Sequence, residues 1–330
     1  MPALSRLLSR IALAGMAAWL VLLVLPLGSA APAEEEAAHL VLLAPLVLVP
    51  LFLDAALPAS FSARPSRLLT ASGWALLPAA LAAAGGFLVD AGPEAGALAV
   101  PWLVVTALLA TWALRRAWGL WQADRLDASE ALVTVGFASL LGGAVWLFLS
   151  RVGIAPGDSD LGVLLTAAHV HHAAFAAPVW AGLLGRALPE AARPAHAALG
   201  AGLVVGFGLV AVGVAVNPGP GGPALVETVG VVVLTLSATG VGALGMVMAP
   251  RLGDRSSALM VAVSGGALAL AMGLALWVDV GPRLGVGVPD SVRMLAQNGW
   301  LSAVGFGLWG ALGWRRLKPR PRIAEAARGG

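Results

Sequence analysis

The 330-residue chain is 59% hydrophobic and 11% charged, with a formal net charge of +3 and no cysteine. Soluble domains are about half apolar and roughly a quarter charged, so these few charges could not cover a water-exposed surface of this size. The missing cysteines exclude disulfides, thiolate metal sites, iron–sulfur clusters and covalent haem attachment.

The apolar runs predict an all-α, polytopic bundle of about ten transmembrane helices surrounded by the lipid bilayer. A helix needs about 20 apolar residues to cross the hydrocarbon core. The predicted helices cover, in chain order, approximately residues 11–31, 39–57, 68–89, 95–114, 131–150, 161–185, 195–216, 228–250, 256–278 and 291–314. The connections are short, so residues 1–330 are expected to form a single integral membrane domain that ends in a basic cytoplasmic tail over 315–330.

The basic residues predict the orientation of this bundle. If the N-terminus is cytoplasmic and the helices alternate in direction, 17 of the 20 Lys and Arg residues fall in cytoplasmic segments. The three others are Arg151, Arg283 and Arg293. This bias is what the positive-inside rule expects, so both termini are predicted to be cytoplasmic. The same scatter of basic residues over short loops argues against a nucleic-acid binder, despite a pI near 10.8.

The first apolar run leaves two readings open. Arg6 and Arg10 precede it, and it ends in Gly28-Ser29-Ala30-Ala31, which resembles a signal-peptide cleavage site. The run is longer than the apolar region of a usual signal peptide, so a retained helix is the favoured interpretation.

The predicted helices contain several prolines and tryptophans. Pro45, Pro50 and Pro178 each remove a helical hydrogen bond and predict bends. The tryptophans of the first and fourth helices and of the segment after the fourth fit an interfacial aromatic belt; they are Trp19, Trp102, Trp112, Trp118 and Trp121.

Three of the five histidines lie in the middle of the sixth predicted helix, as His169, His171 and His172. Ionisable side chains inside a membrane span usually face the bundle interior or a cavity, and they indicate function. His169 and His172 are three residues apart and share a helix face, whereas His171 points elsewhere. Neutral imidazole ligates zinc, copper or haem iron, and its pKa near neutrality also suits proton transfer. His169 and His172 are therefore the candidate metal ligands, and the alternative is that all three histidines only hydrogen-bond neighbouring helices.

A polar layer in the outer half of the bundle is a second expectation. His169 lies about 12 Å below the outer edge of its helix, and Gln297 and Asn298 lie at a comparable depth in the last helix, with Arg293 just above them. Interhelical hydrogen bonding is the competing role for Gln297 and Asn298.

Other polar residues are weaker candidates. Asp54 is placed near the cytoplasmic end of the second helix, where it could pair with Arg64 or Arg67. His39 and His196 lie at the boundaries of predicted helices and are expected to be interfacial. Phosphate-binding loops, dinucleotide fingerprints, HExxH and GxSxG are all absent, so the sequence supports none of those enzyme chemistries and assigns no catalytic residue.

Two segments resemble motifs of the YndJ-like bacterial membrane proteins. Residues 166–175 (TAAHVHHAAF), with Pro178 soon after, are similar to the pattern T-A-x-H-F-H-Y-A-G-F, which aligns His169 and His171 with the family's two histidines. Residues 294–306 (MLAQNGWLSAVGF) resemble M-x-x-x-H-G-x-x-N-A-x-G-F, but Asn298 and Ser302 replace its histidine and asparagine. Residues 42–53 (LLAPLVLVPLFL) are similar to an early apolar segment. The resemblance implies a multi-pass protein of the bacterial inner membrane and assigns no activity.

Three functions follow from these residues. The first is a site on His169, His171 and His172, with Asn298 opposite, that binds a metal, haem or small ligand. The second is a proton-coupled transporter that uses the histidines as a relay. The third is a non-catalytic membrane component that assembles with protein partners and uses its histidines to hold helices together.

Overall fold

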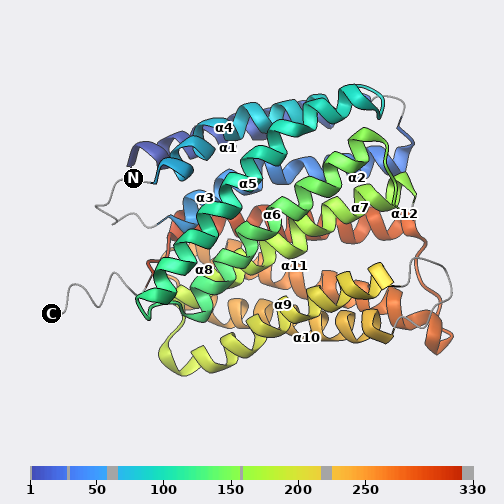
Figure 1. The fold of residues 1–330 in the computed structure, drawn as a ribbon. Helices are drawn as coiled ribbons and strands as arrows, with labels where there is room; N and C mark the ends of the chain where they lie inside the picture. Colours follow the sequence, from blue (N-terminus) through green and yellow to red (C-terminus); the bar gives the residue numbers. More distant parts are fainter. Residues whose placement is uncertain (1, 28–29, 58–65, 157–158, 217–224, 322–330) are drawn as a thin grey trace. The chain divides into compact units, whose positions relative to one another are not determined.

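The computed structural model describes residues 2–27, 30–57, 66–156, 159–216 and 225–321, without the side chains of residues 214–216, 283, 291 and 292. Every regular element within these ranges is helical, which confirms the all-α prediction (Figure 1). Helical residues occupy each of the ten predicted ranges. The chain divides into two compact units, residues 1–187 with 314–330, and residues 188–313.

Eight helices of the described chain are long and apolar enough to cross a membrane: Pro2–Leu22, Pro32–Ala56, Arg67–Gly85, Pro93–Gln122, Ala128–Val152, Glu190–Gly213, Leu225–Arg251 and Arg255–Val280. The two other predicted spans, 161–185 and 291–314, are helical segments interrupted by π-helical turns. The count of about ten spans therefore stays a prediction, and eight is the number that length and composition support.

The first unit contains α1 (Pro2–Leu22), α2 (Pro32–Leu43), α3 (Val49–Ala56), α4 (Arg67–Gly85), α5 (Pro93–Gln122), α6 (Ala128–Val152), α7 (Asp160–His169) and α8 (Ala177–Ala187). A π-helical segment, η1 (Ala44–Leu48), joins α2 to α3, and a second, η2 (Val170–Ala176), joins α7 to α8. The end of α13 (Trp309–Leu317), from Trp314 onward, also belongs to this unit.

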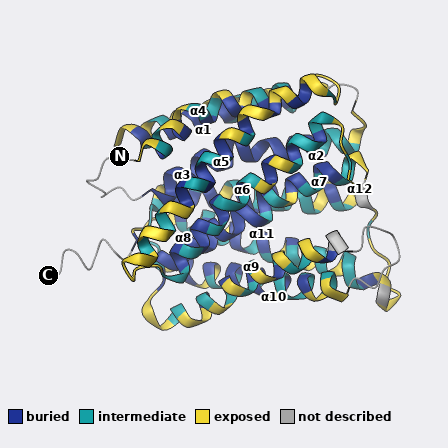
Figure 2. Cartoon of the chain, viewed as in Figure 1, coloured by how far each residue is buried: buried dark blue, intermediate teal, exposed yellow. Residues whose placement is uncertain are grey.

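The continuous helix α2–η1–α3 is the most buried part of the first unit. Every residue from Ala37 to Leu57 is buried, and α1, α4, α7 and α8 all contact this segment. Figure 2 shows α3 and α8 almost entirely buried, whereas α1 and α4 each carry an exposed face. A helix that is apolar on all sides, as this one is, is expected at the centre of a bundle.

Pro45 accounts for the π-helical turn in this central helix. Proline has no N–H group to donate to the carbonyl of Val41, four residues back. The N–H of Ala44 donates to Val41 instead, and the N–H of Val49 then bonds to Ala44, five residues back. The bend predicted at Pro45 is therefore a local change of helical register.

At the N-terminus, the ends of the first helix differ from the ends of the charge-free run that predicted it. α1 begins at Pro2 and contains Arg6 and Arg10, and it ends at Leu22, before Pro26. A charge-free run marks the apolar stretch but not the helix, because arginine is a good helix former and proline is not.

The second unit contains η3 (Glu190–Ala192), α9 (Arg193–Val216), α10 (Leu225–Met248), η4 (Ala249–Arg251), α11 (Arg255–Val280), η5 (Gly281–Leu284), α12 (Ser291–Met294), η6 (Leu295–Gly299) and η7 (Leu301–Leu308), with the start of α13. Glycines set its closest contacts. A Cβ on Gly206 would lie 2.5 Å from the backbone nitrogen of Leu234, so α9 and α10 approach at a distance that only glycine permits.

Side-chain caps mark where five helices of the described chain begin. Ser66, Asp127, Ser159, Asp254 and Asp290 each accept a hydrogen bond from the first turn of α4, α6, α7, α11 and α12 respectively. Asp254 accepts from the hydroxyl of Ser257 and from that of Ser256, and these hydrogen bonds lower the pKa of its carboxyl to about 2. The carboxyl of Asp254 therefore stays ionised at neutral pH, next to the N-terminal end of α11, which is the positive end of the helix dipole.

Candidate functional site

The histidine motif lies at the junction of α7 and η2. His169 is the last residue of α7, and His171 and His172 lie in the π-helical segment. The N–H of Ala177 bonds to the carbonyl of His172, five residues back, and Pro178 has no N–H for the carbonyl of Ala174. Short π-helical segments occur frequently at functional sites.

His171 is fully buried and both of its ring nitrogens have partners. Nδ1 donates to the carbonyl of Ala167 at 2.8 Å, and Nε2 accepts from the indole Nε1–H of Trp102 at 3.3 Å. Because a carbonyl only accepts and an indole only donates, these partners select the neutral tautomer with its proton on Nδ1. The two rings are also stacked, with centroids 6.2 Å apart.

The stacking of His171 on Trp102 was not predicted. The interfacial belt was predicted to include Trp102, but this residue is completely buried, and Trp19 and Trp112 are buried as well. The belt interpretation is therefore wrong for these three residues. The position of Trp102 along its helix did not predict its exposure, because its side chain faces the neighbouring helix instead of lipid.

His172 is 7% exposed and bonds to the central helix. Its Nε2 donates to the carbonyl of Leu40 at 3.0 Å, a contact between residues 132 positions apart. Within the described chain its Nδ1 is buried and has no hydrogen-bond partner. The lone pair on Nδ1 of His172 is therefore the buried position at which the histidine motif could still bind a ligand.

His39, which belongs to the central helix, makes a similar contact with α1. Its Nε2 donates to the carbonyl of Leu22 at 3.0 Å, and its own carbonyl accepts from the indole of Trp19 at 2.8 Å. His39 and His196 are both buried, so the expectation that they are interfacial is wrong.

His169 differs from its neighbours because it is exposed. Its Nδ1 lies 2.8 Å from the carbonyl of Leu165, one turn back in its own helix. The candidate metal pair His169 and His172 therefore joins an exposed ring to a buried one. Among the residues that the structure describes, no group of three or more His, Cys, Asp and Glu side chains is placed to hold a metal ion.

The remaining predicted residues of the polar layer belong to the second unit. Gln297 is exposed, and Arg293 is exposed and pairs with Asp290 at 3.5 Å. Asn298 is half-buried, and its buried Oδ1 has no hydrogen-bond partner in the described chain. The predicted layer stays a prediction, because its two halves lie in units that are described separately.

Asp54 is buried and holds the C-terminal segment of the first unit. Its carboxylate lies 2.6 Å from Nζ of Lys318 and 3.1 Å from Nε of Arg315. The same two basic residues donate to the hydroxyls of Ser5 and Ser9 in α1. Arg67 is exposed and is not its partner, and Arg64 lies outside the described residues. The expected pairing with Arg67 is therefore wrong, and the partners that the structure shows come from the opposite end of the sequence.

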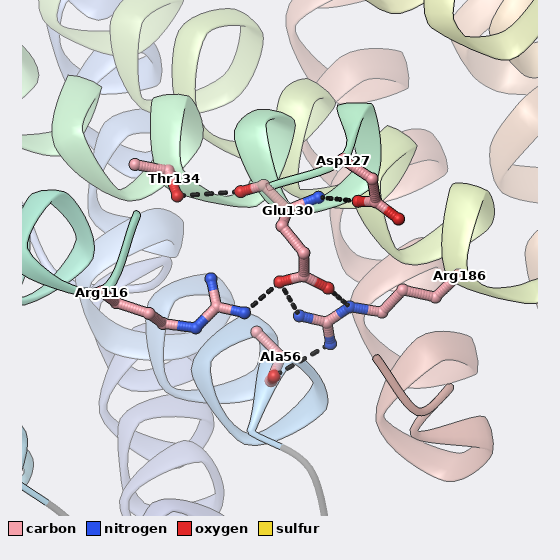
Figure 3. Close-up of polar contacts among 6 residues, drawn as sticks. All are labelled: Ala56, Arg116, Asp127, Glu130, Thr134 and Arg186. Carbon is pink, nitrogen blue, oxygen red and sulfur yellow. Dashed lines mark hydrogen bonds and ion pairs between the residues drawn. The ribbon is translucent and has the colours of Figure 1, made fainter. Parts of the chain in front are cut away.

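A second buried charge cluster lies where α6 begins (Figure 3). Both carboxylate oxygens of Glu130 accept from Arg186, at 2.7 and 3.0 Å, and Arg116 also pairs with Glu130. Arg186 donates as well to the carbonyl of Ala56, at the end of α3, at 2.9 Å. In Figure 3 the two guanidinium groups reach the carboxylate from α5 and α8. The cluster therefore connects four helices.

The predicted helix over 131–150 begins next to Glu130, but the sequence assigned this residue no role and no partner. Arg116, Glu130 and Arg186 all lie next to the ends of apolar runs, and this is the signal that could have grouped them. Two arginines around one carboxylate satisfy the hydrogen-bonding capacity of a buried acid with bidentate geometry.

Comparison with known proteins agrees with the resemblance of the motifs. The family model described as YndJ-like protein matches residues 39–306. The uncharacterized membrane protein YndJ of Bacillus subtilis (strain 168) is 34% identical over 96 residues, which cover 29% of this chain and 17% of that protein. The chain thus matches less than a fifth of the length of this curated relative. No solved structure matches the chain.

Proposed function

Because the chain belongs to the YndJ-like family of membrane proteins, we propose that it is a non-catalytic multi-pass membrane component whose histidine motif holds helices together. The observation that carries this proposal is the hydrogen bonding of the buried histidines. His171 contacts Trp102 of α5, and His172 contacts Leu40 of α2. Interhelical hydrogen bonds of this kind stabilise membrane bundles by about 0.6 to 2 kcal/mol each.

The orientation belongs to the same proposal, with both termini in the cytoplasm of a bacterial cell and the bundle in the inner membrane. The two charge clusters support it. They join the ends of α3, α5 and α8, the start of α6 and the segment from Trp314, all of which the alternation of helices assigns to the cytoplasmic side. The positive-inside bias independently assigns that side.

The donor set argues against a metal or haem at the histidines. Both nitrogens of His171 and one nitrogen of His172 are engaged by protein partners, and a nitrogen whose N–H donates to a carbonyl cannot ligate a metal. A structural or catalytic zinc site needs three or four protein ligands. His169 and His172 together fall short of that number.

Thermal unfolding in detergent tests the structural role. His171→Ala should lower the free energy of unfolding by about 2 to 4 kcal/mol, because it leaves the Trp102 N–H unpaired and creates a cavity. His172→Gln should lose less, because its amide can still donate to the Leu40 carbonyl. His169→Ala is the matched control, since the hydrogen bond that the described chain gives this exposed ring is to Leu165 of its own helix.

Metal and haem analysis of the purified protein separates this role from cofactor binding. We expect no stoichiometric metal and no Soret band in the wild-type protein. A stoichiometric metal that is lost in His172→Gln would contradict the proposal, as would unchanged stability of His171→Ala.

A second candidate, a proton-coupled transporter, rests on the unpartnered Nδ1 of His172. A buried imidazole with one open lone pair can take up a proton and pass it on. Proteoliposomes would then show a pH-dependent flux that His172→Gln abolishes, although this variant keeps its donor to Leu40. An unchanged flux in His172→Gln would exclude the relay.

A further inference from the structure

A cavity of about 70 Å³ opens at the other end of α6, away from Glu130. It lies where the connection between α1 and α2 meets the end of α4, the end of α6 and the start of α7. Its charged and polar lining comes from Glu34, Ser150, Arg151 and Asp160, and its apolar walls include Leu27 and Phe87. On the predicted orientation, this end faces the outside of the cell.

The guanidinium of Arg151 is poorly satisfied at this cavity. Its terminal nitrogens donate to the carbonyl of Gly86 and to the hydroxyl of Ser150, both at 3.4 Å, which is longer than an ordinary hydrogen bond. Its Nε–H is buried and has no partner in the described chain. The group lies 4.2 Å from the centre of the Phe87 ring, and this cation–π contact holds it in place. A buried donor without an acceptor is costly, so an acceptor from a ligand would be favoured here.

Two carboxylates share the cavity without neutralising Arg151 by direct contact. Glu34 and Asp160 both act on the guanidinium electrostatically, yet the described part of the chain contains no ion pair between either of them and Arg151. Glu34 accepts one hydrogen bond, from the N–H of Ala31 at 3.3 Å. The site thus presents one cation and two anions around an empty volume.

We propose that this cavity binds a small zwitterion in which an ammonium group and an oxyanion are a few bonds apart. The oxyanion accepts from the guanidinium of Arg151 and from the hydroxyl of Ser150, and the ammonium group donates to Glu34 and Asp160. A simple anion would meet two carboxylates, and a simple cation would leave the Arg151 donor unpaired. The volume suits about five non-hydrogen atoms, the size of glycine or of the polar part of an aminophospholipid headgroup.

Calorimetric titration of the purified full chain in detergent tests the proposal, with glycine, acetate and methylammonium as probes. Glycine should bind saturably, and acetate and methylammonium at least tenfold more weakly. Arg151→Gln and Glu34→Gln should each weaken glycine binding at least tenfold. Glu94→Gln and Arg125→Gln are controls, because both residues are exposed and neither lines the cavity.

Nanodiscs distinguish a free ligand from a lipid headgroup. If the ligand is a headgroup, phosphatidylethanolamine should raise the melting temperature relative to phosphatidylcholine, whose quaternary ammonium cannot donate hydrogen bonds, and Glu34→Gln should remove the difference. If it is a free amino acid, glycine should bind equally in both lipids. Failure of glycine to bind together with equal melting temperatures in the two lipids overturns the proposal, as does acetate binding as tightly as glycine. Because none of these residues touches the histidine motif, this result is independent of the structural role proposed above.

Discussion

At the scale of single residues, Gly143 decides how closely α6 approaches the histidine motif. A Cβ at this position would lie 2.7 Å from Nδ1 and 2.8 Å from Cε1 of His171. Moving the imidazole away would disturb its stacking on Trp102 and its hydrogen bond to the carbonyl of Ala167. The absence of a side chain at Gly143 is therefore part of the environment of His171.

Gly143→Ala should lower the free energy of unfolding by about 1 to 3 kcal/mol, the usual cost of overfilling a packed core. Gly142→Ala is a matched control one residue earlier, since a Cβ there meets only Val170 Cγ1, at 3.8 Å. That control should be neutral or slightly stabilising, because alanine is the better helix former. Equal effects of the two substitutions on thermal unfolding in detergent would show that His171 is not held as described.

Some properties of the three histidines could be predicted from the sequence, and others could not. The cluster of histidines in an apolar helix was enough to predict buried, polar-contacting rings. It did not reveal that His169 is exposed, since periodicity cannot say which face of a helix meets lipid. It could not name Leu40 as the partner of His172 either, because a helical repeat carries no information about a residue 132 positions away.

At the scale of elements, the Glu130 cluster joins α5, α6 and α8 with the end of α3. Glu130 and Arg186 have side chains only 3% and 1% exposed, so the charges are balanced by one another instead of by water. Such a cluster adds little stability over an apolar core, but removing one partner leaves a buried charge uncompensated.

Glu130→Gln should therefore lower the free energy of unfolding by about 3 to 5 kcal/mol, because Arg186 and Arg116 lose their counter-charge. Glu190→Gln removes an exposed partner of Arg193, 3.8 Å away, and should change stability by less than about 0.5 kcal/mol. The measurement is unfolding in mixed detergent micelles. A loss below 1 kcal/mol for Glu130→Gln would mean that water reaches the cluster.

The π-helical turns show the same limit of prediction for elements. Pro45 and Pro178 predicted irregular helices, and the structure has Pro45 inside η1 and Pro178 just after η2. The sequence could not predict which irregularity would form. A helix that lacks one N–H group can kink, break, or change to hydrogen bonds between residues five positions apart. In the first unit the two π-helical segments, η1 and η2, pack against each other.

At the scale of the whole molecule, the apolar runs predicted the helical class and the approximate position of each long helix, but not the short turns η3 and η5. The long-range pairing of Asp54 with Arg315 and Lys318 was not predicted, since it depends on how the chain ends return to one another. The alternation of helices remains a prediction that the ion pairs of the first unit support.

The lack of cysteine makes the orientation directly testable. Glu94→Cys and Ala123→Cys place single thiols at exposed positions near the two ends of α5. In intact cells, a membrane-impermeant maleimide should label the first and should reach the second only after the cells are opened. The reverse pattern would invert the orientation, and labelling of both in intact cells would contradict a span at α5.

Helix α6 carries a charge at each end and none between, with Glu130 and Arg151 separated by 20 uncharged residues. At 1.5 Å per residue this interval is about 31 Å, close to the thickness of a bilayer's hydrocarbon core. Neither charge can slide inward without leaving its partners, so the helix is matched to one membrane thickness. In thicker or thinner bilayers the mismatch would be taken up by tilting or by deforming lipid, and the protein would partition toward membranes of its own thickness.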